Sequence, residues 1–513
     1  MLKATIGGLT RLAGYWIDEM GFTGYRSGKW VAIKGSTMTI TLNSRADFTL
    51  EAARRVAWGG EGVVLGEASQ QAMVEARARF MRLIDDPEIT IYGVTSGYGQ
   101  NAKNRLKPDE RRAHAAHPST APAASWGDPV PERVSRAIAF ARLANFVEGH
   151  AAVSPAVANG VAAMLGGGAM PVLPARGQGG AGEILSLSHL FLPLARSMQL
   201  EEKDSLSLIN GSPSATGLAV DAALAAEARL EVAAQVFSLA AEAFNTPLGH
   251  FDAELDAYWN NPHDAWALAR IRALMGGGHG GYRRPYQAPV SFRILPRILG
   301  QTHLATRVAR DVAEQSLPAM SDNPALLPPD TEHPDGRAVS TGGYHNAQAP
   351  MAMDMLTASN ANLCVLASRF SAKLQDGAIS LLPLQLSDGD RKTYLGCLGM
   401  AATGYEEEAR MLATATLLPG GEAGGFGQND VASPVFLAWT KQERAGVLLE
   451  STMAALAPVA LKALDITNRP VPQPLAALAE AVRTHVPVHE PGLMMGPATG
   501  ALAEWLRRQV YGG

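Results

Sequence analysis

Long alanine-rich segments with apolar residues three and four positions apart constrain the fold of this chain more than any other feature. This spacing places apolar side chains on one face of an α-helix, and alanine has the highest intrinsic helix propensity. Loops rich in glycine, proline and asparagine separate the segments, without the strand–helix alternation of a doubly wound sheet or barrel. The sequence therefore predicts a mainly α fold, with helices at about 131–168, 183–200, 214–243, 302–318, 346–375, 392–416 and 434–464.

The N-terminal part is less regular. Residues 1–35, which are rich in glycine and aromatic side chains, predict an irregular extension. A helical pattern starts at Thr49, carries a glycine break in its middle and ends before Pro87. The stretch "EITIYGVTSGYGQ" follows, and its β-branched and aromatic residues predict a short strand that leads into a glycine-rich loop.

Composition excludes several classes of protein. Of the 513 residues, 47% are hydrophobic and 18% are charged, which is typical of a globular chain. The formal net charge of −4 leaves no basic footprint, so neither nucleic acid nor an anionic membrane is an expected partner. The first residues carry charges where a signal peptide needs a clean apolar segment, and the long uncharged run at 153–174 is dominated by alanine, glycine and proline. We therefore expect a soluble, cytoplasmic protein.

The sequence shows no motif for a metal or a cofactor. Cys364 and Cys397 are the only cysteines, too few for a disulfide framework or a cysteine-based zinc site. No HExxH, GxSxG, Walker or EF-hand pattern occurs. His114 and His117 are one helical turn apart, a spacing that can bind a metal ion, but no third ligand is near, so we expect a solvated or substrate-facing pair. The prediction is no metal site and no cofactor.

Six loop segments carry the most specific signal in the chain. They are "IYGVTSGYG" (91–99), "DSLSLINGS" (204–212), "YQAPVSFRILPRILG" (286–300), "SDNP" (321–324), "GGYHNAQAP" (342–350) and "FGQNDVAS" (426–433). In this order they resemble signatures of the histidine and phenylalanine ammonia-lyases, the aromatic amino acid lyase family. One short match of this kind is weak, whereas six in the family's order over residues 45–435 are strong, and the resemblance covers about three quarters of the chain.

The resemblance implies an aromatic amino acid lyase-like fold with a small mixed N-terminal domain and a long central helical bundle. We expect an N-terminal extension at 1–35, a lyase-like domain that carries active-site loops at 36–205, and a central and C-terminal helical bundle at 206–513. It also implies a homotetramer whose active sites combine loops from more than one subunit. This agrees with apolar helix faces that are too extensive for the surface of a monomer.

The segment "RGQGGAGEILSLSHL" (176–190) falls where the family has Ala-Ser-Gly. In the family, that triplet cyclises and loses two waters to form methylidene imidazolone, an electrophilic prosthetic group, and the serine hydroxyl has to leave. Here the triplet is Gly180-Ala181-Gly182, no Ala-Ser-Gly occurs elsewhere, and Ala181 has no hydroxyl to lose. The sequence therefore predicts the family's turn without its prosthetic group. Glu183, which comes next, is expected to cap a helix N-terminus and not to transfer protons.

Other positions of the family's site are retained or replaced. Tyr92 matches the family's catalytic loop tyrosine and Asn210 matches its Asn-Gly amide, so we expect both to be catalytic. Arg293 matches the arginine that binds the substrate carboxylate, a task that suits the two-pronged guanidinium. The family's second catalytic tyrosine falls on Val290, and an acidic residue falls on Asn429. The expected substrate-binding residues are Arg293, Asn429, Gln287, Tyr344, Val290 and His117.

These residues leave three functions open. We favour a lyase-type enzyme that eliminates a good leaving group across Cα–Cβ of a small carboxylate substrate, similar to an ergothionase-like branch of the family that lacks the prosthetic group. A quaternary ammonium suits such an enzyme because it departs as a neutral amine. The alternatives are addition or cyclisation on an activated unsaturated substrate, and a catalytically inactive lyase scaffold that binds a ligand or has a regulatory role.

Overall fold

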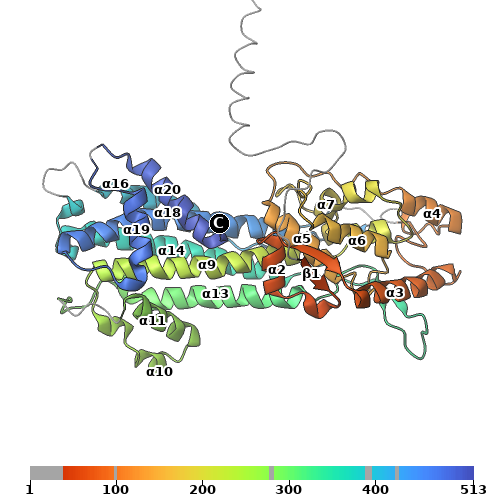
Figure 1. The fold of residues 1–513 in the computed structure, drawn as a ribbon, viewed down its shortest axis with the longest axis horizontal. Helices are drawn as coiled ribbons and strands as arrows, with labels where there is room; N and C mark the ends of the chain where they lie inside the picture. The colour runs from red at the N-terminus through yellow and green to blue at the C-terminus, as the bar shows by residue number, and fades with distance from the viewer. Residues whose placement is uncertain are drawn as a thin grey trace, which may run out of the picture.

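The alanine-rich segments form one elongated helical bundle in the computed structural model of the chain (Figure 1). The structure describes residues 39–97, 101–276, 282–387, 395–421, 427–490 and 492–512, so the predicted extension at 1–35 lies outside the described residues. The main helices of the bundle are α9 (Pro213–Ala243), α13 (Leu295–Ser316), α14 (Gln348–Gln375), α16 (Gly396–Leu412) and α18 (Val435–Thr467). The mainly α fold predicted from the sequence is confirmed.

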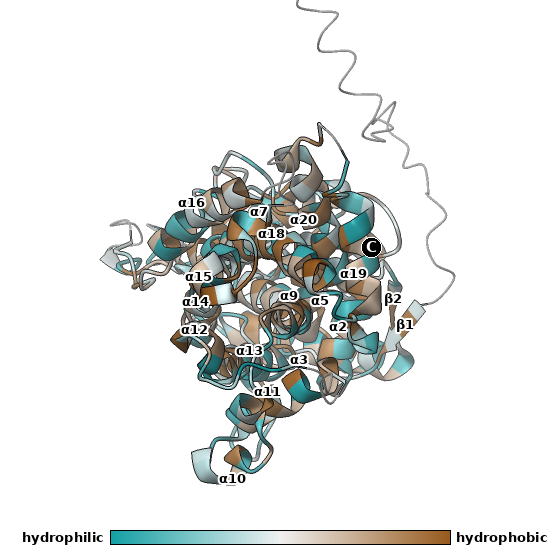
Figure 2. Ribbon diagram, turned by 90° about the vertical axis from the view of Figure 1, so that its left-hand side faces the viewer, coloured by the Kyte–Doolittle hydropathy of each residue, from teal (hydrophilic) through white to brown (hydrophobic). Residues whose placement is uncertain are grey.

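The central helix of the bundle is α9. Figure 2 views the molecule along its long axis and shows α9 in the middle, and this helix packs against α13, α14, α18 and α5 (Glu132–Ala144). Nearly all of its residues are buried, and its many alanines let the neighbouring helices approach closely. By length and composition alone, α18 could cross a membrane, but most of it is buried inside the bundle, as is usual for a core helix.

A small mixed unit precedes the bundle in the chain. Strands β1 (Thr39–Leu42) and β2 (Gly62–Leu65) pair in parallel, with α2 (Leu50–Ala57) between them in the sequence and α3 (Glu67–Asp85) after them. The glycine break predicted inside one helical pattern is therefore the place where β2 forms. The unit joins the bundle through α2, which packs on α5.

The segment predicted as one helix at 131–168 forms two helices, α5 and α6 (Pro155–Met164), which are joined by a turn at 145–154. Gly149 is essential to this turn. Its φ is +77°, and a Cβ at this position would lie 2.2 Å from the Cβ of Ala76 on α3. Only glycine fits there, so the chain turns although the sequence on both sides has helical periodicity.

Shorter elements connect the long helices and close the ends of the bundle. They are η1 (Arg45–Asp47), α4 (Pro108–Ala116), η3 (Ala181–Glu183), α7 (Ile184–Ser197), α8 (Asp204–Ile209), η4 (Leu248–Phe251), α10 (Leu255–Trp259), α11 (Pro262–Leu274), α12 (Val290–Arg293), β3 (Ala325–Leu327), β4 (Arg337–Val339), α15 (Gly377–Ser380), η5 (Leu384–Leu386), η6 (Gln473–Leu475), α19 (Ala476–His485) and α20 (Met495–Tyr511). Strands β3 and β4 form an antiparallel pair.

Two large apolar clusters fill the core. One joins side chains of the N-terminal part, such as Phe140 and Val161, to side chains of the bundle, such as Ala222 and Leu356. The other fills the opposite half of the bundle. Because the first cluster includes residues from both sides of it, the predicted boundary after residue 205 does not coincide with a gap in the core. The domain boundaries stay a prediction.

A buried network of charges holds α20 on the bundle. The Tyr511 hydroxyl donates a hydrogen bond to Glu443 at 2.6 Å and accepts one from Arg229 at 2.6 Å. The Arg133 guanidinium lies 4.0 Å from the centre of the Tyr511 ring and pairs with the carboxylate of Asp221. Burial raises the pKa of Tyr511, so its hydroxyl keeps the proton that it donates.

Candidate active site

The triplet turn lies in front of α7 and brings together segments that are far apart in the sequence. Gly182 and Glu183 both have a left-handed backbone, with φ of 63° and 60°. A Cβ on Gly182 would lie 3.3 Å from Oδ1 of Asn210 and 3.4 Å from Cδ2 of Tyr344. A glycine is therefore required for two reasons, the backbone conformation and the close approach of two side chains.

Glu183 caps a helix N-terminus, as predicted. The capped helix is α9 and not α7, although α7 starts directly after Glu183. Its carboxylate accepts hydrogen bonds from the backbone N–H of Ser214 at 2.6 Å and of Ala215 at 2.8 Å. These are free donors in the first turn of α9. The side chain is buried, and burial raises the pKa of Glu183 to about 8, although the two N–H donors and the nearby Arg142 oppose the shift. The turn is thereby fixed to the central helix.

Asn210 follows α8 with an extended backbone. Its Oδ1 accepts a hydrogen bond from the backbone N–H of Gly211 at 2.7 Å, so the side chain also stabilises its own turn. Its backbone carbonyl accepts a hydrogen bond from the buried guanidinium of Arg142. That guanidinium lies 3.6 Å from the carboxylate of Asp322, which pairs with Lys203. A group of buried charges thus supports Asn210 from behind.

Tyr92 lies on a turn, so the strand predicted before the glycine-rich loop is wrong. Residues 88–97 form turns and irregular backbone apart from one isolated bridge. The Thr95 hydroxyl accepts a hydrogen bond from the backbone N–H of Ile91 at 2.7 Å, and this local bond replaces the pairing that a strand would have. Ile91 and Val94 are buried in a small apolar cluster, which holds Tyr92 between them, half-buried, at the edge of a cavity.

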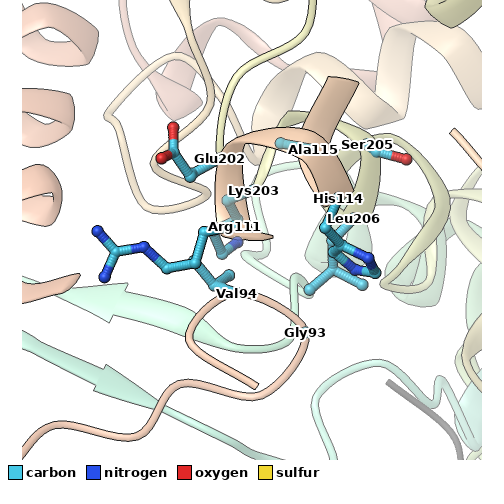
Figure 3. A pocket seen from close by; sticks show the side chains of 9 residues that line it. All are labelled: Gly93, Val94, Arg111, His114, Ala115, Glu202, Lys203, Ser205 and Leu206. Atoms are coloured by element: carbon cyan, nitrogen blue, oxygen red, sulfur yellow. The ribbon is translucent and has the colours of Figure 1, made fainter. Parts of the chain in front are cut away.

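Helix α4 packs behind the turn that carries Tyr92, and Figure 3 looks into the small cavity between them. In that view the His114 ring lies beside Leu206, whereas Arg111 points the other way. Burial lowers the pKa of His114, which favours the neutral ring. His117 is exposed just after α4 and lines neither this cavity nor that of Tyr92. Within one chain, the structure does not bring the two histidines to the predicted site.

A cavity of about 380 Å³ opens over the triplet turn. It is lined by Tyr92, Ala181, Gly182, Ile184, Asn210, Asn323, Ser340, Thr341, Gly342, Tyr344, Gln428 and Asn429. The structure thus brings together four of the predicted side chains, those of Tyr92, Asn210, Tyr344 and Asn429, with the triplet. None of the described lining residues is an aspartate, glutamate, histidine, lysine or arginine. The polar side chains among these described residues carry phenols, hydroxyls and amides, and the titratable ones among them are the two tyrosines.

Several residues of the cavity were missed by the sequence prediction: Asn323, Ser340, Thr341, Gln428 and Ile184. The side-chain oxygen of Asn323 accepts hydrogen bonds from the Thr341 N–H at 2.8 Å and from the Ser340 hydroxyl at 3.2 Å. These bonds join the loop before β3 to the loop after β4. Asn323 lies in "SDNP" and Gln428 in "FGQNDVAS", so these two motifs could have indicated both residues as part of the site.

The loop of Arg293 lies at the opposite end of the bundle. Phe292 stacks on Phe244 with ring centroids 4.2 Å apart, and Phe244 directly follows the C-terminal end of α9. Asn210 precedes the N-terminal end of the same helix. At a rise of 1.5 Å per residue, the 31 residues of α9 separate these ends by about 46 Å. One chain therefore cannot bring Arg293 and Tyr92 to the same small ligand.

Hydrogen bonds hold the loop that carries Arg293 on one side, and its other side is exposed. Arg293 Nε donates a hydrogen bond to the carbonyl of Ala288 at 3.1 Å, and His250 Nε2 accepts one from the N–H of Ala288 at 3.2 Å. Burial and the charge of Arg293 lower the pKa of His250, which keeps Nε2 able to accept. Gln287 and Val290 are exposed. Within the part of the chain that the structure describes, Arg293 has no acidic partner.

The comparisons with known proteins agree with this architecture. The model of the aromatic amino acid lyase family matches residues 48–197 and 195–486. Histidine ammonia-lyase of Geobacillus thermodenitrificans (strain NG80-2) is 27% identical over 360 residues, which are 65% of this chain and 70% of that enzyme. Ergothionase from Treponema denticola superposes with a TM-score of 0.82 at 18% identity over 92% of this chain and 99% of that one. Tyrosine aminomutase from Streptomyces globisporus superposes with a TM-score of 0.79 at 25% identity over 90% and 96%. The chain belongs to the aromatic amino acid lyase family.

Proposed function

We propose that this chain is a lyase-type enzyme that eliminates a good leaving group across the Cα–Cβ bond of a small carboxylate substrate, without methylidene imidazolone. Family membership supports the coarser part of this statement, an elimination of the ammonia-lyase type. The observation that carries the finer part is the cavity, in which Tyr92, Asn210 and Asn429 line the same space as Ala181. By the resemblance, Ala181 takes the place of the serine from which the family's prosthetic group forms.

The residues of the turn do not fit that prosthetic group. Its exocyclic alkene requires the loss of a side-chain hydroxyl from the middle residue of the triplet, and Ala181 carries only a methyl group. Gly180 and Gly182 have no side chain to supply one. The reaction therefore depends on the other side chains of the cavity and on the leaving group of the substrate itself.

A quaternary ammonium on Cα meets this requirement. Tyr92, as the phenolate, takes the proton from Cβ, and the electron pair of that C–H bond forms the C=C bond. The C–N bond breaks with its electron pair on nitrogen, so a neutral trialkylamine leaves and no acid has to protonate it. The products are an α,β-unsaturated carboxylate, the amine and the neutral phenol. Asn210 and Asn429 offer amide groups that orient the substrate.

The carboxylate is bound by Arg293 of a second copy of the chain, because α9 keeps the two ends of one chain apart. A homotetramer, as the resemblance implies, provides such a copy. Large apolar side chains exposed along the bundle support an oligomer: Leu304 is 40% exposed, Met351 62%, Leu437 58% and Leu417 76%. Such side chains mark an interface where they form a contiguous patch. The cytoplasmic location stays a prediction.

The reaction is tested with a panel of carboxylate betaines, starting with the betaine of thiolhistidine. We expect release of a free trialkylamine together with absorbance from a conjugated acid, and no turnover of histidine, phenylalanine or tyrosine. The intact mass should equal that of the plain chain. A deficit of two waters in the peptide that contains Ala181 would contradict the proposal. A product without released amine would favour addition or cyclisation, and binding without any product would favour the inactive scaffold.

The role of Tyr92 is tested by its replacement with phenylalanine, which keeps the ring. Tyr92→Phe should lower kcat by ~100-fold or more and leave ligand binding nearly intact, because only the proton-transferring group is lost. An unchanged kcat would exclude Tyr92 as the base. Arg293→Lys should weaken binding although the charge is kept, since an ammonium does not reproduce the two parallel hydrogen bonds of a guanidinium.

The shared site is tested by co-expression of two inactive chains. Tyr92→Phe and Arg293→Ala chains are each inactive alone, but a mixed oligomer contains sites with an intact Tyr92 from one chain and an intact Arg293 from another. Random assembly should restore about a quarter of the wild-type activity. No recovery in a mixed oligomer of normal mass would mean that Arg293 does not complete the site of another copy.

A further inference from the structure

The described wall of the cavity offers aromatic rings and neutral polar groups to a cationic ligand. Among the residues that the structure describes, this wall has phenols, hydroxyls and amides, but no carboxylate. Two buried carboxylates lie close behind it, and both are engaged: Glu183 binds the first N–H groups of α9, and Asp322 pairs with Lys203. Among these residues a primary ammonium would find amide and hydroxyl oxygens but no anionic partner to offset its lost hydration. A quaternary ammonium, in contrast, is bound well by aromatic rings.

Tyr344 presents such a ring directly at the triplet turn. Its Cδ2 and Cγ lie 3.4 Å and 3.7 Å from the position that a Cβ on Gly182 would occupy, so the ring packs on the bare backbone of the glycine. The side chain is half-buried and lines the cavity. Its hydroxyl forms no hydrogen bond with any described residue, so packing and not a polar contact of the phenol positions it.

The loop that carries Tyr344 is fixed on both sides. Before it, the Thr341 N–H donates to Asn323 at 2.8 Å, and the Gly343 N–H donates to the Thr341 hydroxyl at 3.0 Å. After it, the Asn346 side-chain amide donates to the Ser316 hydroxyl at 2.9 Å, at the end of α13. The loop is therefore ordered before a ligand arrives, and binding does not have to order it.

We propose that the Tyr344 ring binds a quaternary ammonium group of the substrate through a cation–π contact above the triplet turn. In this role Tyr344 determines specificity, since it selects N-trialkylated carboxylates over the corresponding primary amino acids. The placement also suits the reaction, because Tyr92 lines the same cavity. The inference deepens the proposed function and rests on it for the reaction, whereas the binding itself does not require turnover.

The test compares two carboxylates of the same shape. Trimethylammonioacetate carries the cation, and 3,3-dimethylbutanoate has a neutral carbon in place of the nitrogen. Neither can undergo elimination across Cα–Cβ with loss of an amine, because the first has no Cβ–H and the second has no nitrogen. Calorimetry on the full-length oligomer should show tighter binding of trimethylammonioacetate. Tyr344→Leu should reduce this preference by about five- to thirtyfold, the range of a cation–π contact.

Two control variants make the result specific. Tyr344→Phe keeps the ring and should keep the preference. Tyr258→Leu removes a tyrosine that is 82% exposed on α10, outside the cavity, and should change nothing. Equal binding of both ligands by the wild type would overturn the proposal, and so would an equal loss in Tyr344→Phe and Tyr344→Leu, because the hydroxyl and not the ring would then matter. A preserved preference without amine release from any betaine would refute the proposed reaction and leave the binding site standing.

Discussion

Replacement of Glu183 by glutamine should remove a pH dependence from the stability of this protein. The Glu183 carboxylate is buried at the N-terminus of α9, where it accepts hydrogen bonds from Ser214 and Ala215, with Arg142 nearby. Burial outweighs these groups and raises the pKa of Glu183 from 4.5 to about 8. A group with a raised pKa in the folded state contributes stability that is fully present below the unfolded pKa and is lost as the pH rises through the folded pKa. Stability should therefore fall between about pH 4.5 and pH 8.

The two pKa values set the size of the effect. With 4.5 for the unfolded chain and about 8 for the folded one, linkage gives a loss of about 3 kcal/mol between about pH 5.5 and pH 8.5. Glutamine cannot ionise, so Glu183→Gln should lack this loss. Its single acceptor oxygen faces two N–H donors, which costs about 1–3 kcal/mol at every pH. Because that cost does not change with pH, the difference between the two proteins reports on the ionisation alone.

The assay is urea unfolding of both proteins at one protein concentration, followed by circular dichroism at several pH values across this range. The free energy of unfolding of the wild type, relative to that of Glu183→Gln, should fall by about 3 kcal/mol as the pH rises. Glu407→Gln, which changes an exposed carboxylate on α16, is the matched control and should follow the wild type. A constant difference between wild type and Glu183→Gln would refute the reasoning, since α9 and Arg142 would then keep the carboxylate ionised throughout.

Three other substitutions test separate parts of the molecule. Tyr511→Phe removes the hydroxyl shared by Arg229 and Glu443, so the free energy of unfolding in urea should fall by about 1–3 kcal/mol, and an unchanged midpoint would contradict the network. Met351→Glu puts a charge at an exposed apolar position of α14 and should dissociate the predicted oligomer, which light scattering would show as a lower mass. A mass equal to that of the wild type would mean that the interface lies elsewhere. His250→Ala removes the acceptor for the Ala288 N–H in the loop before α12. KM for a betaine substrate should then rise more than kcat falls, and a fall in kcat alone would argue against a role of His250 in positioning this loop.

The helices could be predicted where local signals decide them. The segments predicted at 214–243 and 346–375 form α9 and α14 with nearly the same bounds, because helical periodicity and alanine propensity act between residues a few positions apart. The segment at 131–168 breaks at a turn that depends on the contact between Gly149 and Ala76. These residues lie on different elements, so no local pattern indicates their contact.

The sequence by itself determined which chemical groups the candidate site offers: a tyrosine at position 92, an amide at Asn210 and no serine hydroxyl at Gly180-Ala181-Gly182, because these depend on residue identity alone. Only the tertiary structure decided where the groups stand. In the structure the Tyr344 ring packs on the triplet turn, and Glu183 accepts hydrogen bonds from the first turn of α9. Arg293 lies on α12, beside the C-terminal end of α9. Each relation joins segments far apart in the chain and follows from the way long helices bury their apolar faces against one another, which local sequence patterns do not record.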